Sequence, residues 1–297
     1  MSNISIETKK FTELLNAASA ADDALLLFRD GDGVKTITVA NFKADLRELI
    51  NSKHDDLAGR LNASGAGAHN AIYRGKYLGA SVTAEQYAAI AAGTFDDLYI
   101  GDYWTISGVK YRIAAFDYYL RSGDNVDLQT HHVTVVPDSS LYTHVMNDTN
   151  VTTGAYIGSK MYTEGLTQAK TTINTAFGEA HVLNHRKYLP NAVTDGKPSG
   201  GSWYDSTVEL MSEQNVYGGK IFGAGNDGAT VPSLYTTDKS QFPLFTFRPD
   251  LISNRQTYWL RDVVSAAYFA LVDHGGHASS AYASGAGGVR PAFSIKS

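Results

Sequence analysis

Histidine and aspartate occur at two places where they could hold a metal ion. His131 and His132 are adjacent, and the stretch DHGGH at residues 273–277 offers a carboxylate and two imidazoles around two glycines. Neighbouring residues of a strand point to opposite faces, so we expect one histidine of the adjacent pair in the core and the other at the surface. The second stretch has no evident fourth ligand, and a solvated loop is the simpler interpretation. We therefore predict no metal and no other cofactor.

Two further stretches share single features with ligand-binding loops. The stretch DGDG at residues 30–33 has the first carboxylates of a calcium loop but lacks the remaining ligands and the closing glutamate, so we expect a hairpin turn. The run FGAGNDG at residues 222–228 is rich in glycine, as phosphate-binding loops are. It does not lead from an evident strand into a helix, so we expect a surface loop.

Carbohydrate binding is the chemistry for which the sequence offers the most side chains. A sugar is held by an aromatic platform beside amides and carboxylates, and such residues gather in the second half of the chain. The alternative is that the aromatic side chains, Trp203 in particular, pack irregular segments onto a sheet. The candidate glycan-binding residues are Trp203, Tyr204, Asn226, Asp227 and Tyr282.

Catalysis has less support in the sequence. The absence of cysteine excludes thiol catalysis, thiolate zinc sites and disulfides. No GxSxG motif is present. A polysaccharide hydrolase would need two carboxylates about 5–9 Å apart in a cleft, and the carboxylates of this chain are scattered. We predict that the protein is not an enzyme, with a polysaccharide hydrolase as an alternative.

Two arginines lie in apolar surroundings near the C-terminal end. Arg261 follows the triplet YWL, and Arg290 stands between valine and proline. A buried guanidinium cannot be left unpaired, so we predict that both arginines donate to loop carbonyls or a carboxylate and hold irregular segments against a sheet. Asp262 and Asp250 are the expected carboxylate partners. The residues assigned a structural role are Trp259, Arg261, Arg290 and Phe293.

Residues 1–60 have the pattern of a small α/β module. Residues 7–18 and 41–50 carry apolar side chains at helical spacing, and residues 24–39 have the pattern of a β-hairpin. So small a module buries little surface by itself, which favours a role in oligomerisation or docking. Residues 61–70 are small and polar and are the predicted linker.

Residues 71–297 form the predicted large domain. Helices are expected at residues 82–93, where Thr83 and Gln86 can form a capping box, and at residues 166–178. Strands are expected around Ser107-Gly108, and the other expected strands are residues 131–137, 258–263 and 288–293. Regular periodicity fades over residues 186–257, and residues 273–288 are dominated by small side chains. Residues 186–257 are therefore predicted to be loop-rich, broken by short apolar runs at 208–211 and 242–247, and the predicted loops are residues 197–240 and 273–288.

Composition and charge limit the classes of function. The chain has 297 residues, of which 43% are apolar, so a sizeable core is possible. The 25 basic and 30 acidic residues give a net charge of −5 without a basic patch, which argues against nucleic-acid binding. The first residues lack the order of a signal peptide, and the apolar runs are far shorter than the roughly 18–20 residues that a membrane span needs.

The closing segments YWLR at 258–261 and GVRPAF at 288–293 resemble the final strands of C-type-lectin-like domains. The branch is the formylglycine-generating-enzyme-like one, which also includes phage tropism determinants. Other stretches, such as AIYRGKYLG at 71–79 and HVLNHRKYLPNAVTDG at 181–196, resemble phage and prophage proteins. The resemblance implies an α+β fold with a small twisted antiparallel sheet, two flanking helices, long loops, and first and last strands that lie near each other. The enzymes of this branch use active-site cysteines, so their activity does not carry over.

The same resemblance implies a phage virion protein, assembled in the host bacterial cytoplasm and displayed on the virion surface. Residues 1–60 would attach to other capsid or tail proteins, with a homotrimer as the expected assembly. Residues 71–297 would bind host cell-surface carbohydrate as part of a head or tail fibre. The alternative is a purely structural decoration of capsid or tail that binds no ligand.

Overall fold

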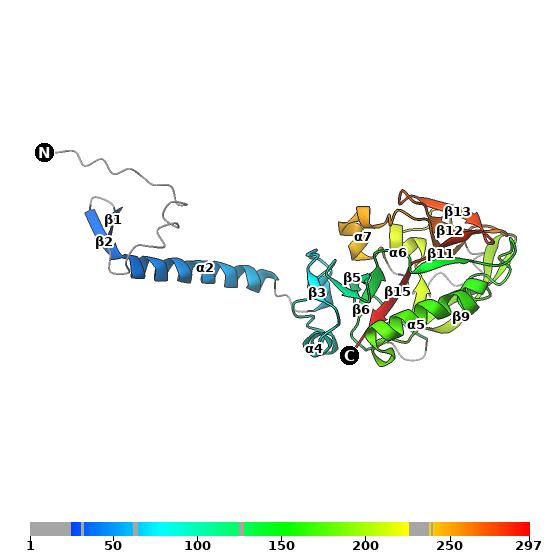
Figure 1. Cartoon of the computed structure of the whole chain (residues 1–297), viewed down its shortest axis with the longest axis horizontal. Helices are drawn as coiled ribbons and strands as arrows, with labels where there is room; N and C mark the ends of the chain where they lie inside the picture. The colour runs from blue at the N-terminus through cyan, green and yellow to red at the C-terminus, as the bar shows by residue number, and fades with distance from the viewer. Residues whose placement is uncertain (1–24, 31–32, 62–64, 125–127, 226–237, 239) are drawn as a thin grey trace. The chain divides into compact units, whose positions relative to one another are not determined.

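The computed structural model of this chain describes residues 25–30, 33–61, 65–124, 128–225, 238 and 240–297. The chain divides into two compact units, Met1–Ala63 and Ser64–Ser297. The second unit contains both helices and strands, with β-sheet as its main component (Figure 1). This agrees with the α+β class expected from the sequence.

The first unit contains a hairpin followed by a long helix. Strands β1 (Leu25–Asp30) and β2 (Gly33–Thr38) pair antiparallel, with Asp30 opposite Gly33, as the sequence predicts. The helix α2 (Val39–Leu61) includes the predicted helix at residues 41–50 and continues beyond it. The helix expected at residues 7–18 lies outside the described residues.

The predicted linker at residues 61–70 is wrong over its second half. Helix α3 (Ala66–His69) belongs to the second unit, and His69 Nδ1 lies 2.5 Å from the carbonyl oxygen of Leu98. The Asn70 side chain donates to the carbonyl of Phe116 and accepts from its amide, at 2.9 and 2.8 Å. The segment was predicted to be a linker because it has few apolar side chains to bury. It is nevertheless held in the second unit by polar side chains that bond to backbone groups, and such contacts require no apolar residues.

The larger sheet of the second unit has the described strand order β10-β15-β6-β5-β4-β3. Neighbouring strands are antiparallel except β3 and β4, which are parallel. The first and last described strands of the unit, β3 and β15, belong to this one sheet, with β4, β5 and β6 between them. The strands are β3 (Tyr77–Gly79), β4 (Tyr103–Ile106), β5 (Val109–Phe116), β6 (Val133–Pro137), β10 (Val208–Leu210) and β15 (Pro291–Ile295).

Two helices predicted from the sequence are present. In α4 (Ala84–Ala92) the Thr83 hydroxyl accepts from the Gln86 amide and the Gln86 side chain accepts from the Thr83 amide, which confirms the capping box. Helix α5 (Leu166–Phe177) has a buried apolar face. Its Phe177 ring contacts the ring of Phe293 at a centroid distance of 5.0 Å, so α5 packs on strand β15.

The second described sheet has the order β13-β12-β11-β14-β7. Residues 273–288 were expected to be a loop, yet they supply strands β13 and β14. Small residues are required here, because a Cβ atom on Gly287 would lie 2.7 Å from the indole nitrogen of buried Trp259. The strands are β7 (Tyr142–Val145), β11 (Tyr258–Val263), β12 (Tyr268–Val272), β13 (Ala278–Tyr282) and β14 (Ala286–Val289).

A long hairpin occupies part of the segment that was predicted to be loop-rich. Strands β8 (His185–Thr194) and β9 (Lys197–Ser206) pair antiparallel along their length. The inward residues at the start of β8 are His185, Lys187 and Leu189, so the alternation exists but two of its buried positions are polar. Short helices complete the described segments: α6 (Glu213–Tyr217), α7 (Pro243–Phe247), and the single turns Met161–Gly165, Glu179–His181 and Pro249–Leu251.

Arg290 is buried and holds an irregular segment against both sheets. Its guanidinium donates to the carbonyls of Leu251 and Ile252 at 3.0 and 2.9 Å, and its Nε donates to the carbonyl of Pro137 on β6 at 2.8 Å. The carbonyl partners expected from the sequence are thus present. The expected carboxylate partner is wrong, because Asp250 is exposed and is paired with Arg248.

We expect Arg290→Met to lower the free energy of unfolding by about 3 kcal/mol, because the carbonyls of Pro137 and Leu251 each lose a donor at about 1–3 kcal/mol. The carbonyl of Ile252 keeps the Tyr258 hydroxyl as a donor. Arg248→Met is the matched control, since it breaks an exposed Arg–Asp pair worth about 0–1 kcal/mol. Urea unfolding followed by tryptophan fluorescence checks both, because all three tryptophans lie in the second unit. Equal effects of the two substitutions would contradict a structural role for Arg290.

Candidate functional site

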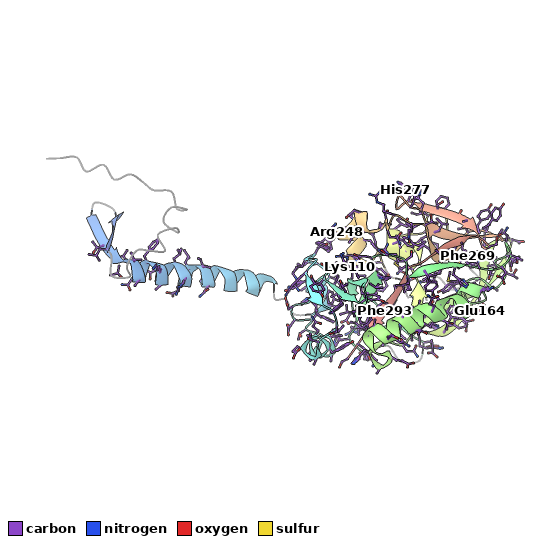
Figure 2. All side chains as sticks on the ribbon, viewed as in Figure 1. Lys110, Glu164, Arg248, Phe269, His277 and Phe293 are labelled. Atoms are coloured by element: carbon purple, nitrogen blue, oxygen red, sulfur yellow. The ribbon has the colours of Figure 1, made fainter. Side chains whose placement is uncertain are left out.

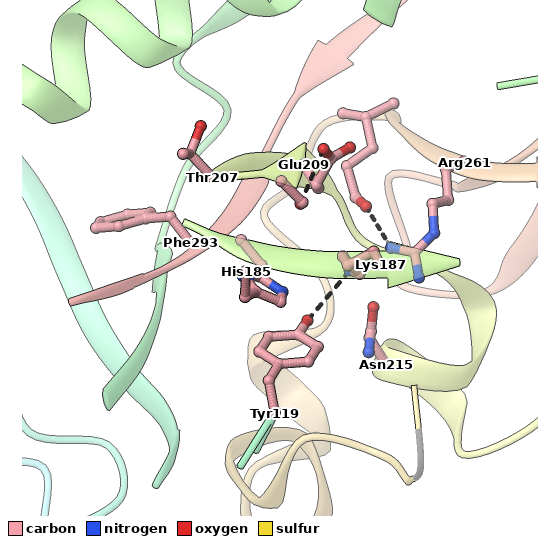
Figure 3. A pocket seen from close by; sticks show the side chains of 11 residues that line it. Tyr119, His185, Lys187, Thr207, Glu209, Asn215, Arg261 and Phe293 are labelled. Carbon is pink, nitrogen blue, oxygen red and sulfur yellow. Dashed lines mark hydrogen bonds between the residues drawn. The ribbon is translucent and has the colours of Figure 1, made fainter. Parts of the chain in front are cut away.

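Charged side chains from separate elements meet in the interior of the second unit. Lys187 comes from β8, Glu209 from β10 and Arg261 from β11, while Asp238 stands ahead of α7. Figure 3 shows Lys187, Glu209 and Arg261 around one pocket, with Tyr119 below them. We call this group the buried polar cluster, and its members are Tyr119, His185, Lys187, Glu209, Asp238 and Arg261, all of them buried.

Arg261 organises the cluster. Its Nη1 donates to the carbonyl of Leu210 at 2.8 Å, and its Nη2 forms an ion pair with Oδ2 of Asp238. The hydroxyl of Ser212 also donates to Oδ2 of Asp238, at 2.9 Å. The expected partner Asp262 is wrong: its carboxylate accepts from the Glu213 amide at 2.7 Å. As neighbours in β11, Arg261 and Asp262 point to opposite faces of the strand.

Lys187 is a fully buried lysine, with 1% of its surface exposed. Its Nζ lies 3.6 Å from Oδ1 of Asp238 and donates to the hydroxyl of Tyr119 at 3.3 Å. Burial, followed by the positive charge of Arg261, lowers the pKa of Lys187 well below its ordinary value, although Glu209 acts in the opposite direction. A lowered pKa favours the neutral amine, which is the nucleophilic form of lysine.

His185 and Glu209 carry polar atoms that lack partners within the described residues. The His185 ring stacks on Tyr119 at a centroid distance of 4.2 Å, and neither ring nitrogen has a hydrogen-bond partner there. Burial lowers the pKa of His185 well below its ordinary value, so the ring is neutral. Glu209 Oε1 accepts from the Ser206 hydroxyl at 2.9 Å, whereas Oε2 accepts from no described group.

The pocket inside the cluster has a volume of about 10 Å³. That is the space that a single water molecule needs. The groups around it can therefore react with one another or hold a water molecule, but no sugar fits among them.

The glycine-rich run at residues 222–228 has a described part that ends at residue 225. The carboxylate of buried Glu213 accepts from the amides of Ile221, Phe222 and Gly223, at 2.8, 2.9 and 2.8 Å. Consecutive amides do form an anion-binding arrangement here. The anion is a side chain of the same chain, so these amides are not open to a phosphate.

The two histidine motifs have the structures that the sequence predicts. His132 is buried while His131 is partly exposed and lies 2.7 Å from a carboxylate oxygen of Asp117. In the stretch 273–277, one oxygen of Asp273 accepts from the amides of residues 275 and 277, and His277 lies at the surface (Figure 2). Within the described ranges no group of three or more His, Asp or Glu side chains is placed to hold a metal ion.

The candidate glycan-binding residues do not form one platform. Trp203 and Tyr204 are neighbours on β9, where successive side chains point to opposite faces. Trp203 packs edge-on against Tyr188, and the Tyr204 hydroxyl accepts from Asn191 at 2.8 Å. Tyr282, on β13, is 50% exposed. Asn226 and Asp227 lie outside the described residues.

Sequence analysis missed Lys187, Glu209 and Asp238. The alternation of buried and half-buried residues from His185 to Leu189 was the available signal, but histidine and lysine at inward positions obscured it. Asp238 lies 23 residues before Arg261 in the chain and in no regular element, so no spacing rule connects the two.

Comparison with known proteins places no further constraint on the site. No family model, no curated protein and no solved structure matches the chain. Among the described helices, none has both the length and the apolar character needed to cross a membrane.

We expect the second unit to lose stability as the pH falls below about 6.5. Below that pH His185 binds a proton in the unfolded chain, whereas in the folded chain its lowered pKa keeps the ring neutral. One such histidine changes the free energy of unfolding by at most about 1.4 kcal/mol per pH unit. His185→Phe keeps a ring against Tyr119 and removes this titration. Urea unfolding at pH 6.5 and pH 5.5 should give a smaller difference for the variant.

His132 is a useful internal reference for that comparison. Burial also lowers its pKa, and it is present in both proteins, so its contribution cancels in the difference. Equal pH dependence of the wild type and His185→Phe would show that the folded protein accepts the proton at His185.

Proposed function

We propose that this chain is a phage virion protein, a fibre or decoration of the head or tail, which acts by binding rather than by catalysis. The second unit would be a C-type-lectin-like domain that binds host-surface or mucosal glycan. The first unit would attach to other virion proteins and assemble the chain as a homotrimer. The observation that carries this proposal is an independent first unit whose helix exposes apolar side chains.

Helix α2 supports self-association. Leu49 and Ile50 are 55% and 56% exposed, and Phe42 and Leu46, on the same side of the helix, are only partly buried. The 23 residues of α2 span roughly 35 Å at the rise of an α-helix. An apolar stripe of this kind is stable in water when another helix covers it, and the same stripe on a second and third copy is complementary to it.

The second unit offers better support for binding than for hydrolysis. An open depression of about 640 Å³ lies beside α4, and its carboxylates include Asp97. Partial burial raises the pKa of Asp97, but the hydrogen bonds from Lys76 and Arg74 lower it by a larger amount. The pKa of Asp97 is therefore below its ordinary value. A carboxyl that stays ionised is a poor general acid, which a glycoside hydrolase requires.

The exposed aromatic pair on the second sheet is the part of the expected glycan site that the geometry supports. Tyr282 on the edge strand β13 lies against Tyr268 of β12, with a ring-centroid distance of 4.3 Å. Ser284, two residues beyond Tyr282, donates to the side-chain oxygen of Asn150 at 2.7 Å. A half-exposed tyrosine face near amide and hydroxyl groups has the chemistry to hold a sugar ring.

We expect Leu49→Asp/Ile50→Asp to convert the trimer into a monomer, because two charges would be buried in the proposed interface. Ala44→Asp/Asn51→Asp is the matched control, since it adds the same charge on the opposite, exposed side of α2. Sedimentation equilibrium of the full chains gives the mass directly. A monomeric wild-type chain, or equal behaviour of the two variants, would exclude assembly through this stripe.

We expect the full chain to bind cell-wall polysaccharide from Gram-positive bacteria, and Tyr282→Ala to weaken binding about tenfold, the equivalent of roughly 1.4 kcal/mol. Tyr77→Ala is the matched control, because Tyr77 is 51% exposed and also contacts a second tyrosine, Tyr103. Saturable binding competed by soluble glycan is the measurement. Attachment to purified phage particles without any polysaccharide binding would favour the purely structural decoration.

A further inference from the structure

The buried polar cluster brings an amine and a carboxyl group together out of contact with solvent. Lys187 Nζ lies 3.6 Å from Oδ1 of Asp238, and the two residues come from separate parts of the chain. We propose that Lys187 and Asp238 condense to an intramolecular isopeptide bond, with Glu209 relaying the proton between them. This inference is independent of the proposed glycan binding.

The amine of Lys187 is in the state that can attack. A protonated amine has three donors to satisfy, yet within the described part of the chain the Tyr119 hydroxyl, at 3.3 Å, is the one hydrogen-bond acceptor of Nζ. Oδ1 of Asp238 lies 3.6 Å from Nζ, beyond hydrogen-bond distance, so it solvates a charged amine poorly. Transfer of one proton from Nζ to this oxygen gives the neutral amine and the protonated carboxyl that the reaction requires. The lowered pKa of Lys187 has the same origin, first burial and then the charge of Arg261.

The carboxyl group of Asp238 is held for attack by groups on one of its oxygens. Arg261 pairs with Oδ2, and Ser212 donates to the same atom at 2.9 Å. Negative charge develops on the oxygen of a carbonyl when an amine adds to its carbon, and fixed donors stabilise that charge. Oδ2 is thus the oxygen that remains as the amide carbonyl, and Oδ1, facing Lys187, is the one that leaves.

Glu209 is placed to move the proton. It lines the same small pocket as Lys187, and its Oε1 is held by the Ser206 hydroxyl. Its Oε2 is buried and accepts from no group in the described ranges. A carboxyl oxygen without a hydrogen-bond partner, in the pocket that holds the reacting amine, has the chemistry of a general base that later returns the proton as a general acid.

The condensation balances without any further reactant. With Lys187 neutral and the Asp238 carboxyl protonated on Oδ1, the Nζ lone pair forms the bond to Cγ and the bond from Cγ to Oδ1 breaks. One hydrogen of Nζ reaches Oδ1 through Glu209, which ends in its starting state. Oδ1 leaves with two hydrogens as water, and the amide keeps one. The pocket of about 10 Å³ has room for that water molecule.

The test is the intact mass of the purified full chain under denaturing conditions. The proposal predicts a mass lower than the sequence mass by one water molecule. It also predicts a protease-resistant branched peptide that joins the segment around Lys187 to the segment around Asp238. A wild-type chain at the unaltered sequence mass, with Lys187 cleavable by trypsin, would overturn the proposal and leave a buried ion pair.

Three variants assign the roles. Lys187→Met and Glu209→Gln should both restore the full mass expected from their sequences, and Glu209→Gln does so with both reactants still present. Lys110→Met is the matched control, because Lys110 lies 3.8 Å from Asp138 in a partly exposed pair that should not react. A loss of water that persists in Lys187→Met would place the bond elsewhere, and one that persists in Glu209→Gln would exclude Glu209 as the relay.

Discussion

A guanidinium can enter a protein interior only if oxygen atoms meet its N–H groups there, and this requirement shapes the second unit. Arg290 satisfies it with carbonyls of β6 and of residues 251–252, so an irregular segment is fixed where both sheets approach it. Arg261 satisfies it with the Leu210 carbonyl and the Asp238 carboxylate. Arg290 thereby links residues 251–252 to β6, and Arg261 links Asp238 to β10.

The pairing of Arg261 has a consequence for chemistry. By drawing Asp238 inward it places a carboxylate beside Lys187, and both groups are then removed from water. Such a cluster is closed to external substrates, and its reactivity is directed at its own members. Tyr282, by contrast, is half-exposed on an edge strand. The proposed isopeptide bond and the proposed glycan contact therefore involve different parts of one unit.

The first unit follows a different principle. Among the described residues of this unit, a hairpin and one helix enclose no core, and Leu49 and Ile50 are exposed. The proposed trimer would bury these two side chains. The proposed function thus gives assembly to the first unit and recognition to the second.

Local signals in the sequence determined the hairpin of β1 and β2, the capping box of α4, the apolar face of α5 and the burial of both arginines. Each depends on residues within a few positions, where backbone geometry dictates the spacing. The hairpin of β8 and β9 was hidden because His185 and Lys187 occupy inward positions that a pattern of apolar residues would mark. Tertiary structure alone decided which carboxylate pairs with Arg261 and brought Lys187 close to Asp238. Charges far apart in the chain become neighbours only after the segments that carry them have packed together.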